Sequence, residues 1–400
     1  MGELAARFRR LLAQAVGRPP PVPGRPAYLF FCVNGAGLGH LNRCLAIARR
    51  IARLQPDADI CFLTSCRMLE VIWREGYVPY HVPPLAAYGG RMKAAYWDRM
   101  LHTQIRLIVE HHRPTTFVYD GIALYPGLRR ALQTSRFERA AMILRLRHIH
   151  AQPEELSQGL RLFDRIIHPG EAGEARSGLP SPTAQLQPHR VAPILYFDRT
   201  EILSRVEARR RLRLPVDRRV VYLQLGSGNI DDAGTWTNHA LELLARYPDL
   251  EVVLAQSPIA DQEMTPPPSV HLIRQYPNAR FFNAFDFAIS AAGYNTVHEL
   301  LFFGVPAILI PMPRLTDDQE GRARALERAG AAVVVRRPED LAPALEHLLD
   351  DDARARLRNA AKRLIPENGA EEAAQLISDR GWAGGGAPEA AAGPPSPTAL

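Results

Sequence analysis

Lysine, cysteine and long apolar runs are all scarce in this chain of 400 residues. Only Lys93 and Lys362 are lysines among 49 basic residues, so arginine carries nearly all of the positive charge behind the net value of +7. The four cysteines form no CxxC pair and lie mostly in apolar segments, which favours buried, reduced thiols in a cytoplasmic protein. No apolar run approaches the roughly 20 residues of a membrane span, and the N-terminus lacks the apolar core of a signal peptide.

The two ends of the chain lack the pattern of a folded domain. In residues 1–16, apolar side chains recur at helical spacing with arginines between them. This pattern fits a peripheral membrane anchor, a helix docked on the protein, or a frayed end. A proline-rich linker completes this N-terminal extension at residue 26. Residues 381–400 are rich in glycine, alanine and proline without an apolar pattern, and we expect a disordered tail there.

The basic residues are not arranged as in nucleic-acid-binding proteins. The densest cluster, Ala208 to Leu214, has no interleaved aromatic residues and is interpreted as a solvated helix face. We therefore expect no nucleic-acid partner. A basic surface still favours an anionic substrate, or peripheral contact of a cytoplasmic protein with the inner face of an anionic membrane.

Apolar, β-rich runs alternate with helical patterns between the two ends. The alternation predicts an α/β fold with helices on both faces of parallel sheets, and about six strands per half predict two Rossmann-like domains. We place these domains at residues 27–195 and 196–380. The expected strands are Tyr28–Val33, Asp59–Thr64, Thr115–Asp120, Ala140–Leu146, Phe163–His168, Val220–Leu225, Glu251–Gln256, Val270–Ile273, Phe285–Ser290, Pro306–Pro311 and Ala331–Val335.

The first expected strand leads into a glycine loop that ends in His40. Ligands of open α/β sheets bind outside the carboxyl ends of the strands, and Gly35, Gly37 and Gly39 would allow a close approach. A dinucleotide loop would read GxGxxG with an acidic residue after the second strand; this loop reads GxGxG without one, so NAD(P) is disfavoured. The positive helix N-terminus would keep His40 neutral and available as a base. Alternatively, His40 only caps the helix or packs locally.

Two loops of the second half carry further candidate residues. Gly226, Ser227 and Gly228 offer exposed amides and a hydroxyl for a diphosphate, or form a plain strand–helix turn. The second loop begins a helix after a buried strand, and its amides would also receive phosphate. Its residues are Ala292, Gly293, Tyr294, Asn295 and Thr296.

Three polar side chains follow that turn. Glu299 can accept two hydrogen bonds from a ribose, and Asp318 with Gln319 has the donors and acceptors that hexose hydroxyls need. The order of these features resembles the donor-binding region of GT-B glycosyltransferases of family 28, the group that includes the peptidoglycan-precursor N-acetylglucosaminyltransferases. In that family a small-residue turn, a glutamate, a GxP step (here Gly304-Val305-Pro306) and a polar pair recur in this order. The GxxxGH of residues 35–40 resembles the acceptor-side loop of the family.

The resemblance implies two Rossmann-like domains that face each other across a cleft, the first binding an acceptor and the second a nucleotide-diphosphate sugar. Glu299 would bind the ribose, Ser227 and the amides near Gly293 the diphosphate, and the pair Asp318 and Gln319 the sugar. The remaining length, about residues 70–215, matches the family only in architecture. The donor-side loop also lacks the fuller GGSxG form of the family.

In such an enzyme an acceptor hydroxyl attacks the anomeric carbon with inversion, and His40 would remove its proton. Asp120 would orient His40 or touch the acceptor, or it would only cap the turn before Gly121. Fixed amides can stabilise the leaving diphosphate, so we expect no metal and no cofactor. The only DxD, Asp57-Ala58-Asp59, precedes its strand and therefore lies at the wrong end for a metal site.

Two other functions compete with a transferase. GHLNRCLAIA, after the glycine loop, also resembles nucleotide-sugar hydrolases of the same fold, in which the histidine activates water. A hydrolase or epimerase is therefore the alternative, followed by a non-catalytic binding protein. The acceptor stays open among a glycan, a lipid-linked sugar and a small-molecule aglycone. Its pocket is expected around residues 83–97, where Tyr88, Tyr96 and Trp97 either stack on a ligand or only pack.

Overall fold

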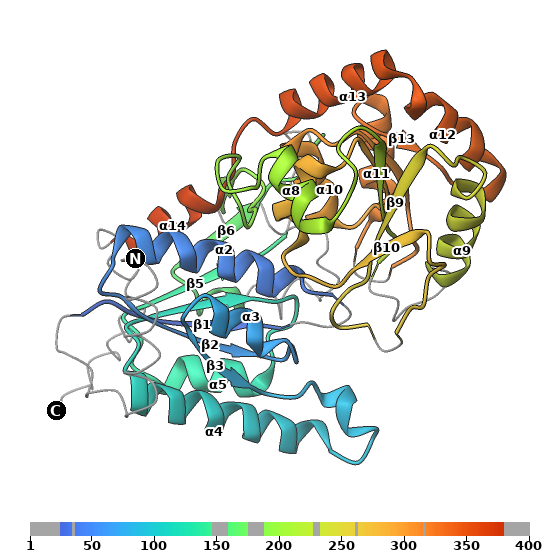
Figure 1. Ribbon diagram of the computed structural model, residues 1–400. Coiled ribbons are helices and arrows are strands. Elements are labelled where there is room, and N and C mark those ends of the chain that lie inside the picture. The colour runs from blue at the N-terminus through green and yellow to red at the C-terminus, as the bar shows by residue number, and fades with distance from the viewer. Residues whose placement is uncertain are drawn as a thin grey trace, which may run out of the picture.

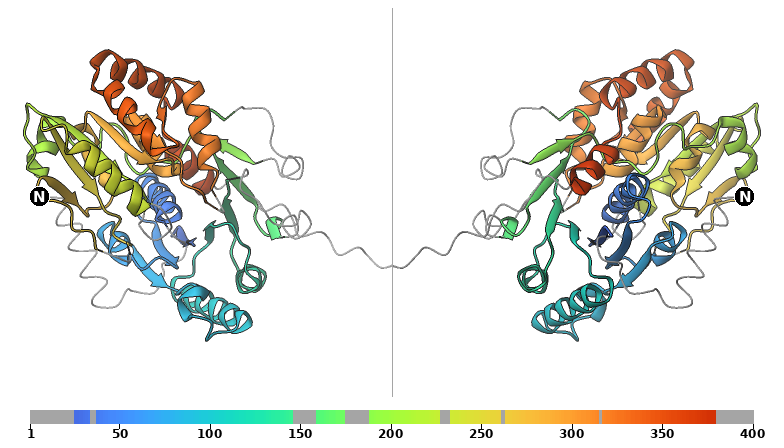
Figure 2. Two further views of the ribbon diagram at one scale, coloured as in Figure 1. Left: turned by 90° about the vertical axis from the view of Figure 1, so that its right-hand side faces the viewer. Right: turned by 90° about the vertical axis from the view of Figure 1, so that its left-hand side faces the viewer.

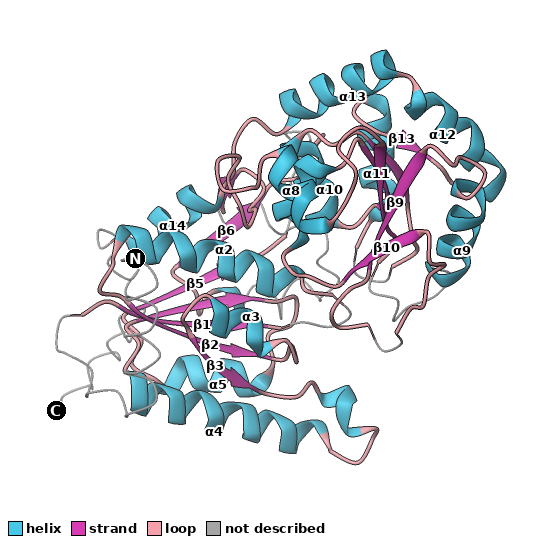
Figure 3. Ribbon diagram, viewed as in Figure 1, coloured by secondary structure: helices cyan, strands magenta, loops and turns pink. Residues whose placement is uncertain are grey.

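Two parallel sheets, one in each half of the chain, form the frame of the molecule (Figure 1). The computed structural model describes residues 25–33, 37–145, 159–174, 188–226, 233–260, 263–314 and 317–379. Helices cover both faces of each sheet (Figure 3). The α/β class and the two Rossmann-like domains predicted from the sequence are confirmed.

The N-terminal sheet has seven strands in the order β3-β2-β1-β4-β5-β6-β7. Their order reverses between β1 and β4, and such a switch point is where open α/β sheets leave a crevice for ligands. The strands are β1 (Ala27–Cys32), β2 (Asp59–Thr64), β3 (Val78–His81), β4 (Thr116–Asp120), β5 (Arg139–Ile143), β6 (Arg165–Pro169) and β7 (His189–Val191).

The C-terminal sheet has six strands in the order β10-β9-β8-β11-β12-β13 and an equivalent switch point between β8 and β11. Its strands are β8 (Arg219–Gln224), β9 (Leu250–Ala255), β10 (Val270–Ile273), β11 (Phe287–Ala291), β12 (Ala307–Ile310) and β13 (Val333–Val334).

The helices fill the connections between the strands. In the N-terminal half they are α2 (Gly39–Leu54), α3 (Leu69–Arg74), α4 (Ala94–His112) and α5 (Pro126–Thr134), with the short 3₁₀ helix η1 (Leu85–Tyr88). In the C-terminal half they are α8 (Arg205–Leu212), α9 (Ala233–Leu244), α10 (Tyr294–Phe303), α11 (Gln319–Arg328), α12 (Leu341–Leu349), α13 (Asp351–Leu364) and α14 (Ala370–Ser378), with the 3₁₀ helices η3 (Asn278–Ala284) and η4 (Pro338–Asp340). None of the helices in the described ranges is long and apolar enough to cross a membrane.

The central strand β1 shows why these sequences form buried parallel strands. Tyr28 and Phe30 pack in the core that includes α2 and α3, while Leu29 and Phe31 pack in the core that includes α4 and α5. Successive side chains of a strand point to opposite faces, so a strand covered on both sides is apolar throughout. The run from Tyr28 to Cys32 therefore contains no polar position to mark an exposed face.

All eleven expected strands are present, with ends shifted by at most three residues. The expectation missed β3 and β7, which form the two edges of the N-terminal sheet. Each is short, and most of their residues are only partly buried, so neither gives a continuous apolar signal. The boundary expected at residues 195/196 lies between β7 and α8 and stays a prediction. The expectations for residues 1–16 and 381–400 concern residues outside the described ranges.

The last helix, α14, returns to the N-terminal half and packs against α2 (Figure 2). Its buried side chains Ala370, Ala373, Ala374 and Ile377 belong to the same core as the buried face of α2. The helix that begins at the glycine loop is therefore supported from both halves of the chain.

Arg50 ties α2 to the segment that joins the two halves. Its side chain is fully buried and donates to the backbone oxygen of Tyr196 at 2.7 Å and to Asp198 at 2.9 Å. Arg53, one turn later, pairs with Glu201 from a half-exposed position. Helix α2 thus contacts the joining segment through one buried arginine, Arg50, and one half-exposed arginine, Arg53.

We predict that Arg50→Ala lowers the free energy of unfolding by about 3–5 kcal/mol, because it leaves a cavity in place of a fully buried side chain and removes its hydrogen bond to Tyr196 and its ion pair with Asp198. Arg53→Ala is the matched control and should cost no more than about 1 kcal/mol, because its ion pair is exposed. Urea unfolding followed by circular dichroism measures both variants. Equal losses in the two would contradict the structural role given to Arg50.

Candidate functional site

His40 and Asp120 meet at the switch point of the N-terminal sheet. His40 is the second residue of α2, which follows β1, and Asp120 is the last residue of the neighbouring strand β4. Nδ1 of His40 lies 2.6 Å from Oδ1 of Asp120. Asp120 is buried, whereas 24% of the His40 side chain is exposed. From the sequence, Asp120 would orient His40, touch the acceptor or only cap a turn. The observed geometry corresponds to the first of these roles.

Arg43 completes this pair and was missed in the sequence. It lies one turn after His40 on α2, and its Nε and Nη2 donate to the two oxygens of Asp120, each at 2.9 Å. Burial alone would favour the neutral acid, but the charge of Arg43 and the hydrogen bonds from Arg43 and His40 outweigh it and hold the pKa of Asp120 below its ordinary value. The sequence feature that could have identified Arg43 is its spacing of three residues from His40, which places both side chains on one face of a helix.

The same geometry assigns the proton on the His40 ring. At 2.6 Å from a carboxylate oxygen, Nδ1 must be the donor, because two unshared electron pairs would repel each other at that distance. Nη2 of Arg43 also lies 3.0 Å from Nδ1, but a guanidinium can only donate, so its hydrogen points to Asp120. Burial, together with the nearby charges of Arg43 and Arg145, lowers the pKa of His40 by more than Asp120 raises it. The neutral ring therefore presents an unprotonated Nε2.

Glu299 of α10 contacts the N-terminal half through Asn42, two residues after His40. Nδ2 of Asn42 donates to Oε1 of Glu299 at 3.3 Å, and the hydroxyl of Tyr276 donates to Oδ1 of Asn42 at 2.8 Å. Tyr276 thereby fixes the amide so that its nitrogen faces Glu299. Burial raises the pKa of Glu299 to about 7, and the hydrogen bond from Asn42 offsets only part of this rise. A desolvated carboxylate of this kind gains most from further hydroxyl donors.

The N-terminus of α10 lies at the second switch point and faces the glycine loop. Gly293 precedes the helix in an extended conformation, and no side chain of the described residues caps the first-turn amides. Asn295 donates through Nδ2 to the backbone oxygen of Gly39 at 3.3 Å, while Thr296 is half-buried beside it. A ten-residue helix with an uncapped N-terminus attracts anions. This end of α10 and the start of α2 therefore form two sides of one site.

Tyr294 forms a further bridge between the halves. Its hydroxyl donates to the backbone oxygen of Gly170 at 2.7 Å. The guanidinium groups of Arg43, Arg145 and Arg322 lie 5.7, 4.7 and 5.6 Å from its ring centroid. Burial raises the pKa of the Tyr294 hydroxyl, so it remains a hydrogen-bond donor.

Two carboxylates, those of Glu171 and Asp317, pair with Arg145 and Arg322. Arg322 donates to Glu171 at 2.9 Å and to Asp317 at 2.7 Å, and Arg145 contacts the same two residues at 3.4 and 3.2 Å. Arg145 and Glu171 come from the N-terminal half, and Arg322 and Asp317 from the C-terminal half. This buried network holds the start of α10 against the N-terminal domain.

The candidate residues of the two glycine loops lie partly within and partly outside the described residues. Gly226 has a φ of +108°, which favours glycine, and a side chain there would point toward Arg314. A Cβ at Gly37 would meet nothing within 4 Å, whereas one at Gly39 would lie 3.5 Å from Nδ2 of Asn295. The other three candidates, Gly35, Ser227 and Gly228, lie outside the described residues.

Asp318 and Gln319 are partly engaged within the protein. Oδ1 of Asp318 accepts from the amide of Gly321 at 2.8 Å and caps α11, and Oε1 of Gln319 accepts from the amide of Met312 at 3.0 Å. The Nε2 of Gln319 is the atom nearest to where a Cβ at Gly293 would stand, 4.0 Å away, so this amide faces the α10 turn. Ala292 accepts from Arg322 at 2.7 Å. Fewer polar atoms of Asp318 and Gln319 are thus available to a sugar than the sequence suggests.

In the described ranges, no group of three or more histidine, cysteine or acidic side chains lies close enough together to hold a metal ion. The metal independence expected from the sequence stays a prediction.

Comparison with known proteins gives the class. Residues 274–378 match the glycosyltransferase family 28 C-terminal domain. The UDP-N-acetylglucosamine--N-acetylmuramyl-(pentapeptide) pyrophosphoryl-undecaprenol N-acetylglucosamine transferase of Acetivibrio thermocellus is 28% identical over 87% of this chain and 97% of its own length. The solved MurG of Acinetobacter baumannii (TM-score 0.57, 15% identity) and the kitacinnamycin glycotransferase (0.60, 18%) have the same fold, over 88% and 89% of this chain and 99% of each of theirs.

The chain is thus an enzyme of the glycosyltransferase class with the GT-B fold. Within that class, its residues 274–378 match the C-terminal domain of glycosyltransferase family 28, which the order of motifs in the second half predicts.

In the role that the sequence predicts for it, Glu299 accepts hydrogen bonds from two ribose hydroxyls of a nucleotide-diphosphate sugar and must first lose its proton. Because its pKa is about 7, we predict that affinity for such a ligand rises roughly tenfold between pH 6 and pH 8. The diphosphate of this ligand is esterified at both ends and does not titrate in that range. Calorimetric titration measures the affinity. Glu299→Gln is the control and should bind weakly at every pH; a pH-independent affinity of the unchanged protein would contradict the role of Glu299.

Proposed function

We propose that the protein is an inverting, metal-independent glycosyltransferase that moves a sugar from a UDP-sugar to an acceptor hydroxyl. The observation that carries the proposal is the contact between two sites, one on each domain. His40, held by Asp120 and Arg43, lies on the helix whose next turn reaches Glu299 through Asn42. A general base and a nucleotide-binding carboxylate joined in this way suit a direct displacement between an acceptor and a donor.

In the proposed reaction, Nε2 of His40 accepts the proton of the acceptor hydroxyl as its oxygen attacks the anomeric carbon. The bond from that carbon to the diphosphate oxygen breaks, and the electron pair leaves with the nucleotide diphosphate. Asp120 stabilises the imidazolium that forms, while Arg43 keeps the carboxylate ionised and in place. Attack opposite the leaving group inverts the configuration at the anomeric carbon.

The C-terminal domain would hold the donor. Glu299 would accept the ribose hydroxyls, and the uncapped amides at Tyr294, Asn295 and Thr296 would face the diphosphate. Because these groups are already oriented, they can stabilise the charge that develops on the leaving group without a metal. The free amide of Gln319 would contact the donor sugar.

The names of the relatives suggest the two substrates. The donor would be UDP-N-acetylglucosamine, and the acceptor a lipid-linked sugar such as N-acetylmuramyl-(pentapeptide) pyrophosphoryl-undecaprenol, as named for the Acetivibrio relative. A net charge of +7 would support peripheral contact of a cytoplasmic enzyme with an anionic membrane that carries such an acceptor.

The first test separates a transferase from a hydrolase. The purified protein is incubated with UDP-N-acetylglucosamine alone, and then with a panel of that lipid-linked acceptor, simple glycans and aromatic aglycones. We expect UDP release below about one turnover per minute without an acceptor and a clear increase with at least one panel member. Rapid release without any acceptor would make water the nucleophile and contradict the proposal.

In the same assay, His40→Ala should lower kcat by about 10²-fold and leave donor affinity nearly unchanged, because it removes a base that acts only in the transition state. His347→Ala, at an exposed position of α12, is the control and should behave as the unchanged protein. An unchanged kcat in His40→Ala would refute the assignment of the base.

A further inference from the structure

The four residues that follow β6 contact the C-terminal half, and we call residues 170–173 the docking segment. Two of them contact α10. The backbone oxygen of Gly170 accepts from the hydroxyl of Tyr294 at 2.7 Å, and the amide of Ala172 donates to Nε2 of His298 at 2.9 Å. Tyr294 and His298 lie one turn apart, so the same face of α10 meets the docking segment twice.

The other two residues of the docking segment contact α11. Glu171 accepts from Arg322 at 2.9 Å, and only 8% and 0% of these two side chains are exposed. Gly173 has a φ of +76°, and a Cβ at this position would lie only 3.1 Å from the Cβ of Ala325. The missing side chain therefore lets the backbone approach α11 closely. Alternate residues of the docking segment thus meet α10 and α11.

His298 connects the docking segment to the first turn of α10 from a fully buried position. A backbone amide can only donate, so Nε2 of His298 accepts from Ala172, and Nδ1 carries the proton and donates to the backbone oxygen of Tyr294. Burial lowers the pKa of His298 to about 4, so the ring stays neutral near pH 7 and keeps this tautomer.

Tyr294 is therefore held at two points. Its hydroxyl bonds to Gly170, and its backbone oxygen is connected to Ala172 through the His298 ring. Tyr294 is also the first residue of α10, where the uncapped amides would face the donor diphosphate. The domain that carries His40 thus fixes the helix turn proposed for the leaving group.

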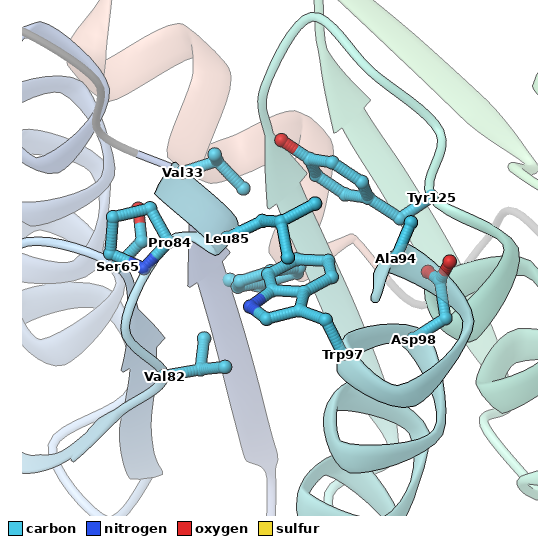
Figure 4. Close-up of a pocket in the computed structure, with 10 residues that line it drawn as sticks. Val33, Ser65, Val82, Pro84, Leu85, Ala94, Trp97, Asp98 and Tyr125 are labelled. Atoms are coloured by element: carbon cyan, nitrogen blue, oxygen red, sulfur yellow. The ribbon is translucent and has the colours of Figure 1, made fainter. Parts of the chain in front are cut away.

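The α4 side of the same sheet is packed less completely. A cavity of about 100 Å³ lies there, lined in part by Val82, Trp97 and Tyr125 (Figure 4). Of the three aromatic residues expected near the acceptor, Trp97 lines this cavity. No residue of the docking segment lines it. Side chains beside a void can shift into it, whereas closely packed groups pass a displacement on. The docking segment is therefore the firmer connection.

We propose that the docking segment is a fixed joint between the two domains, and that Tyr294 and His298 are positioning residues that set the donor diphosphate relative to His40. The proposal rests on the transferase function above, and both side chains act through the helix turn that they hold. A misplacement of about 1 Å between reacting groups can lower a rate about 10²-fold. Loss of the joint should therefore lower kcat, whereas donor affinity, which depends on groups of the C-terminal domain, should change little.

Hydrogen exchange of the Ala172 amide tests the joint without any substrate. This amide lies outside the helices and strands, so its protection depends on the bond to His298. We expect exchange at least about 100-fold slower than in an unstructured peptide. His298→Leu removes the acceptor and should accelerate exchange at least about tenfold, whereas His298→Gln should retain protection, because its Oε1 can accept. Fast exchange in the unchanged protein, or no acceleration in His298→Leu, would overturn the joint.

A matched pair of tyrosine variants tests the positioning role. Tyr294→Phe removes the hydroxyl bond to Gly170 and keeps the backbone amides, while Tyr28→Phe removes an equally short bond, 2.7 Å to Gln55, from a buried tyrosine near the start of β1. Both should lower Tm by similar amounts. In the transferase assay, Tyr294→Phe should lower kcat at least about tenfold and change UDP affinity by less than about twofold. Tyr28→Phe should alter neither. Unchanged kcat in Tyr294→Phe, or equal losses in both variants, would contradict the role.

A double variant shows whether the two side chains act through one joint. Tyr294→Phe combined with His298→Leu should lower kcat by less than the product of the two single effects, because either change alone already loosens the docking segment. Independent effects that multiply would contradict a shared joint.

The exchange and kinetic results keep the two proposals separate. A protected Ala172 amide in a protein that transfers sugar to no acceptor of the panel would support the joint and contradict the proposed function. Transfer by a protein whose Ala172 amide is unprotected would overturn the joint alone.

Discussion

A buried carboxylate held by a buried arginine is the interaction on which the site depends. Asp120 lies at the end of a central strand, away from water, where an ion without a partner would cost several kcal/mol. Arg43 donates to both of its oxygens, and Nδ1 of His40 donates to Oδ1. This one arrangement keeps the carboxylate charged, selects the ring tautomer and leaves Nε2 of His40 unprotonated.

Helix α2 connects these three residues to the rest of the molecule. Its first two turns carry His40, Asn42 and Arg43, so the proposed base, the contact to Glu299 and the ion pair lie on one helix. Its far end is tied to the joining segment by Arg50 and covered by α14. The network around Tyr294 holds α10 from the other side. In the proposed reaction, a nucleotide at α10 would therefore meet groups from both domains, which would link donor binding to the position of His40.

The sequence predicted the fold well because buried parallel strands are apolar on both faces and alternate with helices. It also predicted the loops that meet at the switch points, including His40, Asp120 and Glu299, since strand ends in such sheets converge. It did not predict Arg43, Asn42 or Tyr276, because contacts between residues as far apart as Asn42 and Tyr276 leave no local pattern. The two edge strands were missed for a related reason: half-exposed residues next to proline or arginine carry little apolar signal.

The tautomer of His40 tests the central claim most directly. Long-range ¹H–¹⁵N NMR of the labelled protein at pH 7, with the His40 signals assigned by their loss in His40→Gln, reports the proton on each ring nitrogen. The account predicts a neutral ring with the proton on Nδ1, a strongly deshielded Nδ1–H resonance from the bond to Asp120, and an unprotonated Nε2. A proton on Nε2 at that pH, in either the other neutral tautomer or the imidazolium, would leave Nε2 without a lone pair to accept a proton and would contradict the proposed role of His40 as the base.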